Sequence, residues 1–500
     1  MKKLRRRTSI PNSNSSLFIF TFELPAFRFL LPCFCLIPNF RGYPPKNGIA
    51  VLNAEQKFGI MRGMIIKRDI YLNRLIQSKG DGFVKIVTGI RRCGKSYLLF
   101  KLFRSHLLKA GVNKKNIVEI ALDKRKDARL RDPDAMYAFL SEKTKNARSR
   151  IYIIIDEIQE CKRPKAGHSE TIDERNSREQ EFYDILNEFR ERRNVDLYVT
   201  GSNSRLLVTD VATQFRGRGE IIHISPLTFA EYFDAVGGDK YDAWSNYLLY
   251  GGMPELLSLK SGEAKKAYLE GLFTTIYFKD IVERYALADE LFLSKVNDVL
   301  MSASGSLTNP TKLANHIATI LGRKPDPRTV EKYVMMLSDA YLFKKAERYD
   351  IKGRSYLDFP SKYYPVDVGL RNARLNFRQV EVTHLMECVI FNELIARGAN
   401  VDVGMLEVES RKGGVRQKKQ YEIDFIVNLG HEKVYIQSAY KLPTPEKKEQ
   451  EVRGLKKIGD AFRKLVIVDG VQPLYTDEFG ISYVGLIDFM LNRDILRLAN

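Results

Sequence analysis

Short apolar runs separated by more polar, helix-like segments make up the first half of the chain after residue 60. Phe83–Thr88, Ile151–Ile155 and Val195–Val199 are rich in β-branched residues and too short for buried helices, which predicts strands. A helix-like segment, Tyr97–Leu102, lies between the first two. Strands that alternate with helices are typical of an α/β fold. We therefore expect a three-layer domain around a parallel sheet over residues 64–225.

The pattern changes further along the chain. A helical region is expected over residues 226–300. Two amphipathic helices and two β-rich segments come next, at Thr311–Leu321, Pro327–Leu337, Leu342–Arg348 and Lys362–Val366. This order predicts a winged helix-turn-helix over residues 301–375, used either for packing and relay or for DNA binding.

Residues 1–60 form an N-terminal extension of different character. Its apolar stretch Leu17–Ile37 is interrupted by Glu23 and Arg28. A membrane-spanning helix needs about 20 mostly apolar residues, and a central charge costs roughly 2.5–3.5 kcal/mol. We therefore expect no membrane span. The extension is expected to be disordered or absent from the working protein, which would then begin at Met61 or Met64.

A glycine-rich loop joins the first predicted strand to the first helix. Residues 89–96 read Gly-Ile-Arg-Arg-Cys-Gly-Lys-Ser, which is the P-loop pattern in its strand–loop–helix context. The glycines let backbone N–H groups turn toward phosphates, and the helix N-terminus adds a positive dipole. We expect Lys95 to bridge the β- and γ-phosphates of ATP and Ser96 to ligate Mg²⁺. The predicted binding residues are Gly89, Ile90, Arg91, Arg92, Cys93, Gly94, Lys95 and Ser96.

An acidic pair, Asp156-Glu157, ends the second predicted strand. Many strands end in solvated carboxylates, but here five apolar or aromatic residues precede the pair and the P-loop lies upstream. This is the arrangement of a P-loop ATPase, in which Asp156 would hold Mg²⁺ and Glu157 would polarise the attacking water.

The third predicted strand ends in a polar stretch, Thr200–Ser204. Asn203 is our candidate for γ-phosphate sensing, and a turn or helix cap is the alternative role. Arg216 and Arg218 flank a glycine further on, and either could be an arginine finger, within the chain or into a neighbouring subunit. We take Arg218 as the candidate. A basic turn without catalytic use stays open.

The net charge and the cysteines indicate possible partners and the cellular compartment. The formal net charge is +20, so a polyanion such as DNA is a plausible partner, with Arg328, Lys332 and Lys352 of the predicted winged helix as phosphate contacts. The charge is spread along the chain, however. The five cysteines are irregularly spaced, which favours a reducing, cytoplasmic compartment and predicts neither a disulfide framework nor a cysteine metal site.

Taken in order, these motifs resemble a prokaryotic family of divergent AAA-type ATPases with a C-terminal domain of unknown function, number 4143. The resemblance covers residues 64–480 approximately and rests on six blocks. They are Gly89–Ser96, Asp156–Gln159, Thr200–Ser204, Ser225–Tyr232, Tyr250–Pro254 and Lys279–Tyr285. It implies an ATP-binding protein and leaves the cellular process open.

Polar residues alternate along the C-terminal segment, residues 380–490. Alternation places Glu422 and Asp424 on one face of a predicted strand. Ile423 and Phe425 are expected on the opposite face.

This segment is similar to the PD-(D/E)xK nuclease fold, in which a helix carboxylate such as Glu387 and a strand carboxylate such as Asp424 hold a cation. Gln437 and Ala439 stand where that pattern has Glu and Lys. An amide is a poorer Mg²⁺ ligand, and alanine cannot orient water. Lys441 is expected on the same face, two residues further along, where it could replace the missing lysine only with strain. We expect a nuclease-like fold without robust cleavage.

The leading hypothesis is a Mg²⁺-dependent ATPase that acts as a switch, with closure relayed through the winged helix to the C-terminal domain. A DNA-binding module with ATP-regulated recognition or loading is the alternative, and a metal-dependent nuclease is the third. The expected partners are ATP, DNA under the second hypothesis, and a protein that the sequence does not identify. The chain could be oligomeric, and no membrane partner is expected.

Overall fold

The computed structural model describes residues 65–162, 172–201, 215, 217–285, 287, 289–378, 381–412, 415–430 and 432–496. The predicted extension over residues 1–60 lies outside this part of the chain. The described residues all belong to one contact-defined unit, Gly59–Asn500.

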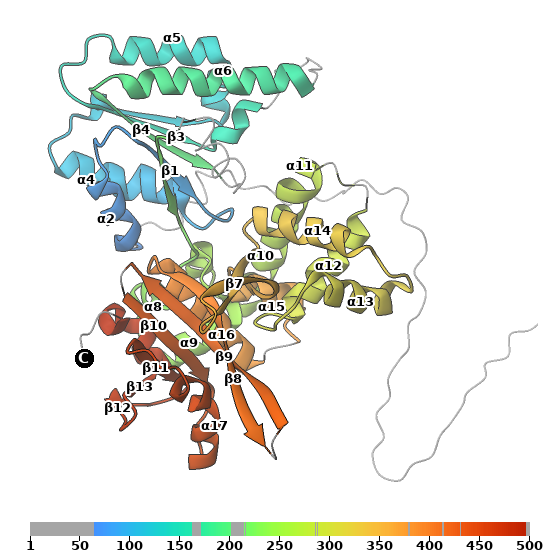
Figure 1. Cartoon of the computed structure of the whole chain (residues 1–500). Coiled ribbons are helices and arrows are strands. Elements are labelled where there is room, and N and C mark those ends of the chain that lie inside the picture. The colour runs from blue at the N-terminus through green and yellow to red at the C-terminus, as the bar shows by residue number, and fades with distance from the viewer. Residues whose placement is uncertain are drawn as a thin grey trace, which may run out of the picture. The chain divides into compact units, whose positions relative to one another are not determined.

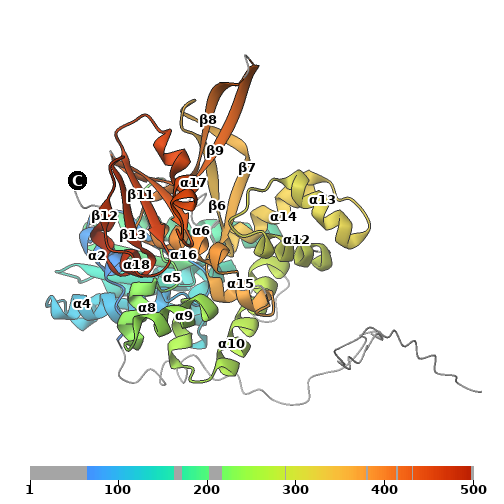
Figure 2. The same ribbon diagram turned by 90° about the horizontal axis from the view of Figure 1, so that it is seen from below.

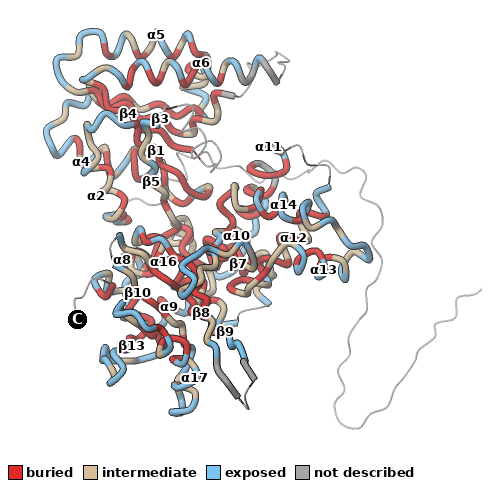
Figure 3. The backbone as a smooth tube through the Cα atoms, viewed as in Figure 1, coloured by how far each residue is buried: buried red, intermediate tan, exposed pale blue. Residues whose placement is uncertain are grey.

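A five-stranded parallel sheet forms the centre of the first domain, in the order β2-β3-β4-β1-β5 (Figure 1). Its strands are β1 (Val84–Thr88), β2 (Ile117–Ala121), β3 (Ile151–Asp156), β4 (Val195–Gly201) and β5 (Gly219–His223). The three predicted strands are β1, β3 and β4, and each is buried along its length (Figure 3). Because every pairing is parallel, the carboxyl ends of all five strands meet at one edge.

Helices cover both faces of this sheet, which confirms the predicted three-layer α/β arrangement (Figure 1). One face carries α5 (Pro133–Thr144) and α6 (Ile172–Glu191), and the other carries α2 (Asp69–Gln77) and a continuous helix built from α3 (Lys95–Tyr97), η1 (Leu98–Phe103) and α4 (Arg104–Lys109). The alternation of strand side chains divides β3 between the two cores. Ile153 and Ile155 pack with α5 and α6, whereas Tyr152 and Ile154 pack with the helix after the P-loop.

The expected helical region follows the sheet. It consists of α8 (Phe229–Val236), α9 (Lys240–Tyr250), α10 (Gly262–Thr275), the π-helical η6 (Ile276–Val282), α11 (Glu283–Tyr285) and α12 (Glu290–Ser302). The chain also contains short 3₁₀ helices at η2 (Lys114–Asn116), η3 (Arg125–Arg131), η4 (Ile158–Lys162), η5 (Pro254–Ser258) and η7 (Arg493–Leu496).

A glycine pair after α9 holds this region against the P-loop. A Cβ on Gly252 would lie 2.2 Å from the carbonyl oxygen of Leu227, so only glycine fits there. The Gly252 N–H donates to Oδ2 of buried Asp367 over 2.7 Å. Met253 then enters the same core as Cys93 of the P-loop. The glycine-containing block Tyr250–Pro254 therefore has a packing role.

The two predicted amphipathic helices are present as α13 (Pro310–Leu321) and α14 (Pro327–Asp339), and the β-rich segments are β6 (Phe343–Asp350) and β7 (Ser355–Pro365). A short helix, α15 (Val368–Arg374), follows. β6 pairs antiparallel with β7 and parallel with β8, so both strands join the C-terminal sheet (Figure 2). That sheet therefore crosses the boundary that we expected between residues 375 and 380.

The C-terminal elements are α16 (Val382–Ala396), β8 (Asn400–Lys412), β9 (Val415–Leu429), β10 (Glu432–Ala439), α17 (Pro445–Lys456), β11 (Arg463–Val468), β12 (Tyr475–Thr476), β13 (Ile481–Gly485) and α18 (Leu486–Leu491). The sheet has the order β12-β13-β11-β10-β9-β8-β6-β7. β9 is antiparallel to β8 and β10, and β10 is parallel to β11.

A β-bulge in β9 corrects one sequence expectation. Asp402 pairs with Ile426 and Gly404 with Ile423, so Asp424 and Phe425 together oppose a single residue of β8. The extra residue breaks the strict alternation. Ile423 consequently packs in the core under α17, whereas Phe425 packs in the core under α16. Our prediction that these two share a face was wrong.

A second correction concerns Lys441. β10 ends at Ala439, so Lys441 lies beyond the strand and does not continue its face. The side chain of Ala439 is buried in the core under α17.

Two further features bear on the sequence expectations. Cys93 and Cys388 are buried free thiols, and Cys161 is buried as well. Within the described ranges, no helix is long and apolar enough to cross a membrane.

Candidate functional site

The P-loop follows β1 at the carboxyl edge of the parallel sheet. Gly89 and Gly94 have φ angles of 145° and 106°, in a region that favours glycine. A Cβ on Gly89 would also lie 2.3 Å from the carbonyl oxygen of Ile224. Helix α3 begins at Lys95, and the first N–H groups of a helix have no acceptor within the helix. The loop and helix therefore present backbone donors suited to an anion.

Lys95 is bonded to its own loop. Its Nζ donates to the carbonyl oxygens of Gly89 and Ile90, over 3.0 and 3.2 Å. The residue is 4% exposed, and both of these acceptors are neutral carbonyls. A buried ammonium held by neutral acceptors alone is a strong attractor for anionic oxygens.

Ser96, Asp156 and Thr200 form one hydrogen-bonded group beside this lysine. The Ser96 hydroxyl donates to Oδ2 of Asp156 over 2.7 Å, and the Thr200 hydroxyl donates to Oδ1 over 2.5 Å. The strand order explains the grouping: β4 lies between β1 and β3, so the end of β4 reaches the gap between the P-loop and Asp156. Sequence reasoning placed Ser96 and Asp156 together but missed Thr200.

Glu157 has a constrained backbone next to this group. Its φ is +53°, which is uncommon for a residue other than glycine. Its N–H donates to the Thr200 hydroxyl over 3.0 Å, and its carboxylate accepts a hydrogen bond from the Gln159 amide. Because strain of this kind persists only where the surroundings impose it, the turn after β3 fixes the direction in which the Glu157 side chain leaves the backbone.

Burial and then the neighbouring Glu157 carboxylate raise the pKa of Asp156 to about 6, whereas the Thr200 and Ser96 hydroxyls and Lys95 act in the opposite direction. A carboxylate next to buried Asp156 disfavours the charged form of Asp156. A cation bound between them would relieve that repulsion.

Two arginines of the P-loop contact the helical region. Arg91 donates from Nε and Nη2 to the two carboxylate oxygens of Asp280, over 2.9 and 2.7 Å. Asp280 lies in η6 with its side chain 3% exposed. The guanidinium of Arg92 lies 6.0 Å from the ring centroid of Tyr268 on α10. A bidentate pair is geometrically specific, so movement of the P-loop and of η6 must be linked.

A second contact joins the base of the P-loop to the turn between α14 and β6. The His223 ring at the end of β5 lies 3.0 Å from the Thr88 hydroxyl, measured from Nδ1. It also packs on Tyr341, with ring centroids 4.8 Å apart. Burial, together with the nearby lysines 344 and 95, holds the pKa of His223 well below its usual range, so the ring is neutral.

Of the predicted sensor and arginine-finger residues, the structure describes Arg218 alone. Asn203 and Arg216 lie outside the described residues. Arg218 is exposed and directly precedes β5, where its carbonyl accepts from the Val84 N–H at the start of β1. It therefore lies at the amino edge of the sheet, roughly 13 Å of strand rise from the P-loop edge. An arginine finger within the same chain is thus wrong for Arg218; a role in a neighbouring subunit stays a prediction.

A second polar cluster lies in the C-terminal sheet. Lys362 of β7 contacts Glu387 of α16 and Glu422 of β9, from Nζ to a carboxylate oxygen over 2.7 and 2.8 Å. Asp424 is 3.8 Å from the same nitrogen, and it accepts one hydrogen bond from Gln437. These acids were expected from the sequence, whereas Lys362 was not, because β7 is distant in sequence.

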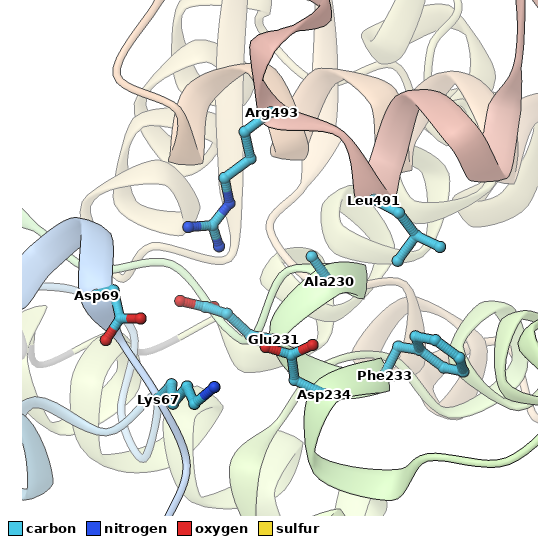
Figure 4. Close-up of a pocket in the computed structure, with 8 residues that line it drawn as sticks. All are labelled: Lys67, Asp69, Ala230, Glu231, Phe233, Asp234, Leu491 and Arg493. Atoms are coloured by element: carbon cyan, nitrogen blue, oxygen red, sulfur yellow. The ribbon is translucent and has the colours of Figure 1, made fainter.

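A pocket of about 350 Å³ lies apart from both groups (Figure 4). Its lining is Lys67, Asp69, Ala230, Glu231, Phe233, Asp234, Leu491 and Arg493. Acidic and basic side chains are mixed around it, and it contains no predicted site residue. Among the described residues, no group of His, Cys, Asp and Glu side chains is arranged to hold a metal ion.

The sheet order, the P-loop and the Ser96–Asp156 pair define a P-loop NTPase of the AAA type. The family profile of an AAA domain matches residues 81–233, and that of a domain of unknown function (DUF8612) matches residues 241–381. The chain belongs to one family with an "uncharacterized protein" of Haemophilus influenzae, which is 32% identical over 437 residues, or 86% of this chain and 100% of the relative.

Two other similarities are more distant. An "uncharacterized protein" of Methanocaldococcus jannaschii is 26% identical over 417 residues, covering 79% of this chain and 82% of the relative. Among solved structures, the Aeropyrum pernix Orc1 protein in complex with DNA is 12% identical with a TM-score of 0.31, covering 64% of this chain and 96% of that one. A likeness at that score carries no functional argument. The AAA-type prediction is confirmed, whereas domain 4143, the winged helix and the nuclease-like fold stay predictions.

Proposed function

We propose that this protein binds ATP with Mg²⁺ at the P-loop and hydrolyses it as a molecular switch. The observation that carries the proposal is the hydrogen-bonded group of Ser96, Asp156 and Thr200 beside the buried Lys95 ammonium. A lysine that attracts phosphate, two possible cation ligands and a neighbouring carboxylate therefore lie together at one edge of the sheet.

The donor set fits Mg²⁺. A carboxylate and a hydroxyl are hard oxygen ligands, and the Ser96 and Asp156 oxygens already lie 2.7 Å apart. The raised pKa of Asp156 indicates a carboxylate that a cation would stabilise. Ser96 and Asp156 would hold the ion, and its role would be to neutralise charge on the phosphates.

The chain's own groups then divide the work of hydrolysis. Lys95 exchanges its loop carbonyls for phosphate oxygens, which stabilises the charge that develops on transfer. Glu157 accepts a proton from the attacking water, because its carboxylate is aimed by the turn after β3. Thr200 holds both residues in place through its contacts with the Asp156 carboxylate and the Glu157 N–H.

The switch proposal rests on the contacts of the P-loop with the rest of the chain. The Arg91–Asp280 pair ties the loop to η6, and the His223–Tyr341 contact ties its base to the turn before β6. β6 in turn pairs with β8 of the C-terminal sheet. A change at the phosphates therefore has a continuous packed route to the C-terminal domain, with the segment between α12 and β7 proposed as a winged helix.

Thr200→Val is expected to lower the ATP turnover rate by about tenfold or more, because two positioning hydrogen bonds are lost while shape is kept. Thr200→Ser retains the hydroxyl and is expected to recover most of the rate. Steady-state phosphate release measures both. Equal rates in the valine and wild-type proteins would remove Thr200 from the mechanism.

Mg²⁺-supported ATP binding is expected to weaken as the pH falls through about 6, since protonated Asp156 is a poor cation ligand and its pKa is raised to about 6 by burial. The stability of the fold changes with pH in the opposite direction. Because the pKa of Asp156 is raised in the folded state, this residue stabilises the folded protein at low pH, and that contribution is lost as the pH rises through about 6. Titration with a fluorescent ATP analogue checks the effect, and binding without Mg²⁺ is the control. A Mg²⁺ effect independent of pH contradicts it.

DNA binding is the second candidate function. The formal net charge is +20, and Arg328, Lys332 and Lys352 are all exposed around α14 and the β6–β7 turn. An ATPase assay with and without DNA separates the two candidates, because a recognition or loading ATPase responds to DNA. Absence of salt-dependent DNA binding at about 50 mM salt would remove this candidate.

We also propose a nuclease-like fold for the C-terminal domain. It is supported by the order α16-β8-β9-β10-α17-β11 and by the acids that α16 and β9 bring to Lys362, Glu387 and Glu422. Cleavage is not expected, since Ala439 offers no group to orient water and Lys362 pairs with Glu387 and Glu422.

A further inference from the structure

Three carboxylates converge on one buried ammonium in the C-terminal sheet. Nζ of Lys362 lies 2.7 Å from Glu387, 2.8 Å from Glu422 and 3.8 Å from Asp424, each measured to a carboxylate oxygen. The Lys362 side chain is 3% exposed. Tyr364, also on β7, donates its hydroxyl to the same oxygen of Glu387 over 2.6 Å.

The acids come from separate elements and meet because of the fold. Glu387 projects from α16, whereas Glu422 and Asp424 project from β9 on either side of Ile423. Alternation puts Glu422 and Asp424 on the same face of β9, and the bulge lies at Asp424 and Phe425, which together oppose one residue of β8. Oδ2 of Asp424 accepts from the Gln437 amide and from the Ser438 N–H, each over 2.8 Å.

The cluster contains more acids than bases, because three carboxylates face the single ammonium of Lys362. Oε1 of Gln437, an amide oxygen beside Asp424, is buried and lacks a hydrogen-bond partner. A carbonyl-type oxygen is also a possible ligand for a hard cation.

We propose that the Lys362 ammonium occupies the place of a divalent cation, so that lysine and metal are mutually exclusive at Glu387, Glu422 and Asp424. The lysine is attached to the chain, so positive charge is supplied to the cluster without any ion from solution. It also ties β7 to α16 and β9, which makes the site a clamp within the sheet. This inference does not depend on the proposed ATPase function.

The test is a comparison of Mn²⁺ binding by nucleotide-free protein, full length in every case. Lys362→Met removes the ammonium and retains the apolar stem. We expect its Mn²⁺ affinity to exceed that of the wild type by about tenfold or more, because hard oxygen ligands are released for the ion. Lys362→Met/Asp424→Asn is expected to lose the gain. Titration calorimetry or Mn²⁺ electron paramagnetic resonance measures the affinity, and the P-loop ligands contribute equally in all proteins.

Lys345→Met is the matched control, since Lys345 lies exposed on the neighbouring β6 and no gain is expected. A folded Lys362→Met protein with wild-type Mn²⁺ affinity overturns the proposal, as does an undiminished gain in the double variant. If Lys362→Met does not fold, Lys362→Met/Glu422→Gln carries one acid fewer and retains Glu387 and Asp424. A gain in that protein supports the proposal, and its absence overturns it.

Discussion

Lys95→Ala is expected to reduce ATP turnover by at least about two to three orders of magnitude, the cost of removing a charged group that stabilises a transition state. The Lys95 ammonium is buried, and it donates to the carbonyls of Gly89 and Ile90. Alanine therefore removes a buried charge without leaving a buried carboxylate unpaired, and the protein should remain folded. Phosphate release under saturating ATP is the measurement.

Lys101→Ala is the matched control for this substitution. Lys101 lies on the same helix, in η1, and is exposed, so turnover should stay at the wild-type rate. Circular dichroism shows whether both variants fold. Substantial turnover in folded Lys95→Ala protein would mean that phosphate is held elsewhere, and the proposed site would be wrong.

Glu157→Gln is expected to lower the turnover rate by about a hundredfold or more, the usual contribution of a positioned general base. ATP binding should persist, because Lys95 and Ser96 are unchanged and glutamine keeps the shape of the side chain. The backbone bond from the Glu157 N–H to Thr200 does not involve the carboxylate, so the turn after β3 should survive. A loss of rate with ATP affinity kept separates this role from a structural one.

Glu142→Gln on α5 is the control for the same chemical change at an exposed position. Single-turnover measurements with radiolabelled ATP resolve binding from hydrolysis. Wild-type hydrolysis in the glutamine variant would leave Asp156 as cation ligand and transfer the base role to another group. Loss of binding together with hydrolysis would show that Glu157 supports the site rather than the reaction.

Local sequence patterns were sufficient for the features that a few consecutive residues create. The P-loop is specified by its own glycines and lysine, and its strand and helix neighbours follow from apolar runs. The same holds for Asp156-Glu157 at the end of a buried strand. The amphipathic segments at residues 311–321 and 327–337 form helices because their apolar positions recur at helical spacing.

The prediction from alternating residues was wrong in β9, where the strand is irregular. Ile423 and Phe425 pack on opposite sides of the C-terminal sheet because β9 gains a residue relative to β8. Nothing in the sequence of a strand marks which partner residue will be skipped, since a bulge is a property of the pair.

Short sequence patterns were therefore enough to predict a nucleotide site: a loop for phosphate, a lysine, a hydroxyl and an acidic pair, in that order. Which distant groups complete each site depends on the tertiary structure. Thr200 reaches Asp156 because β4 lies between β1 and β3, and the same parallel order leaves Arg218 at the opposite edge. Lys362 reaches its acids because β7 shares their sheet. The physical reason is that strand order and neutralisation of buried charge depend on chain crossings in space, which local periodicity does not encode.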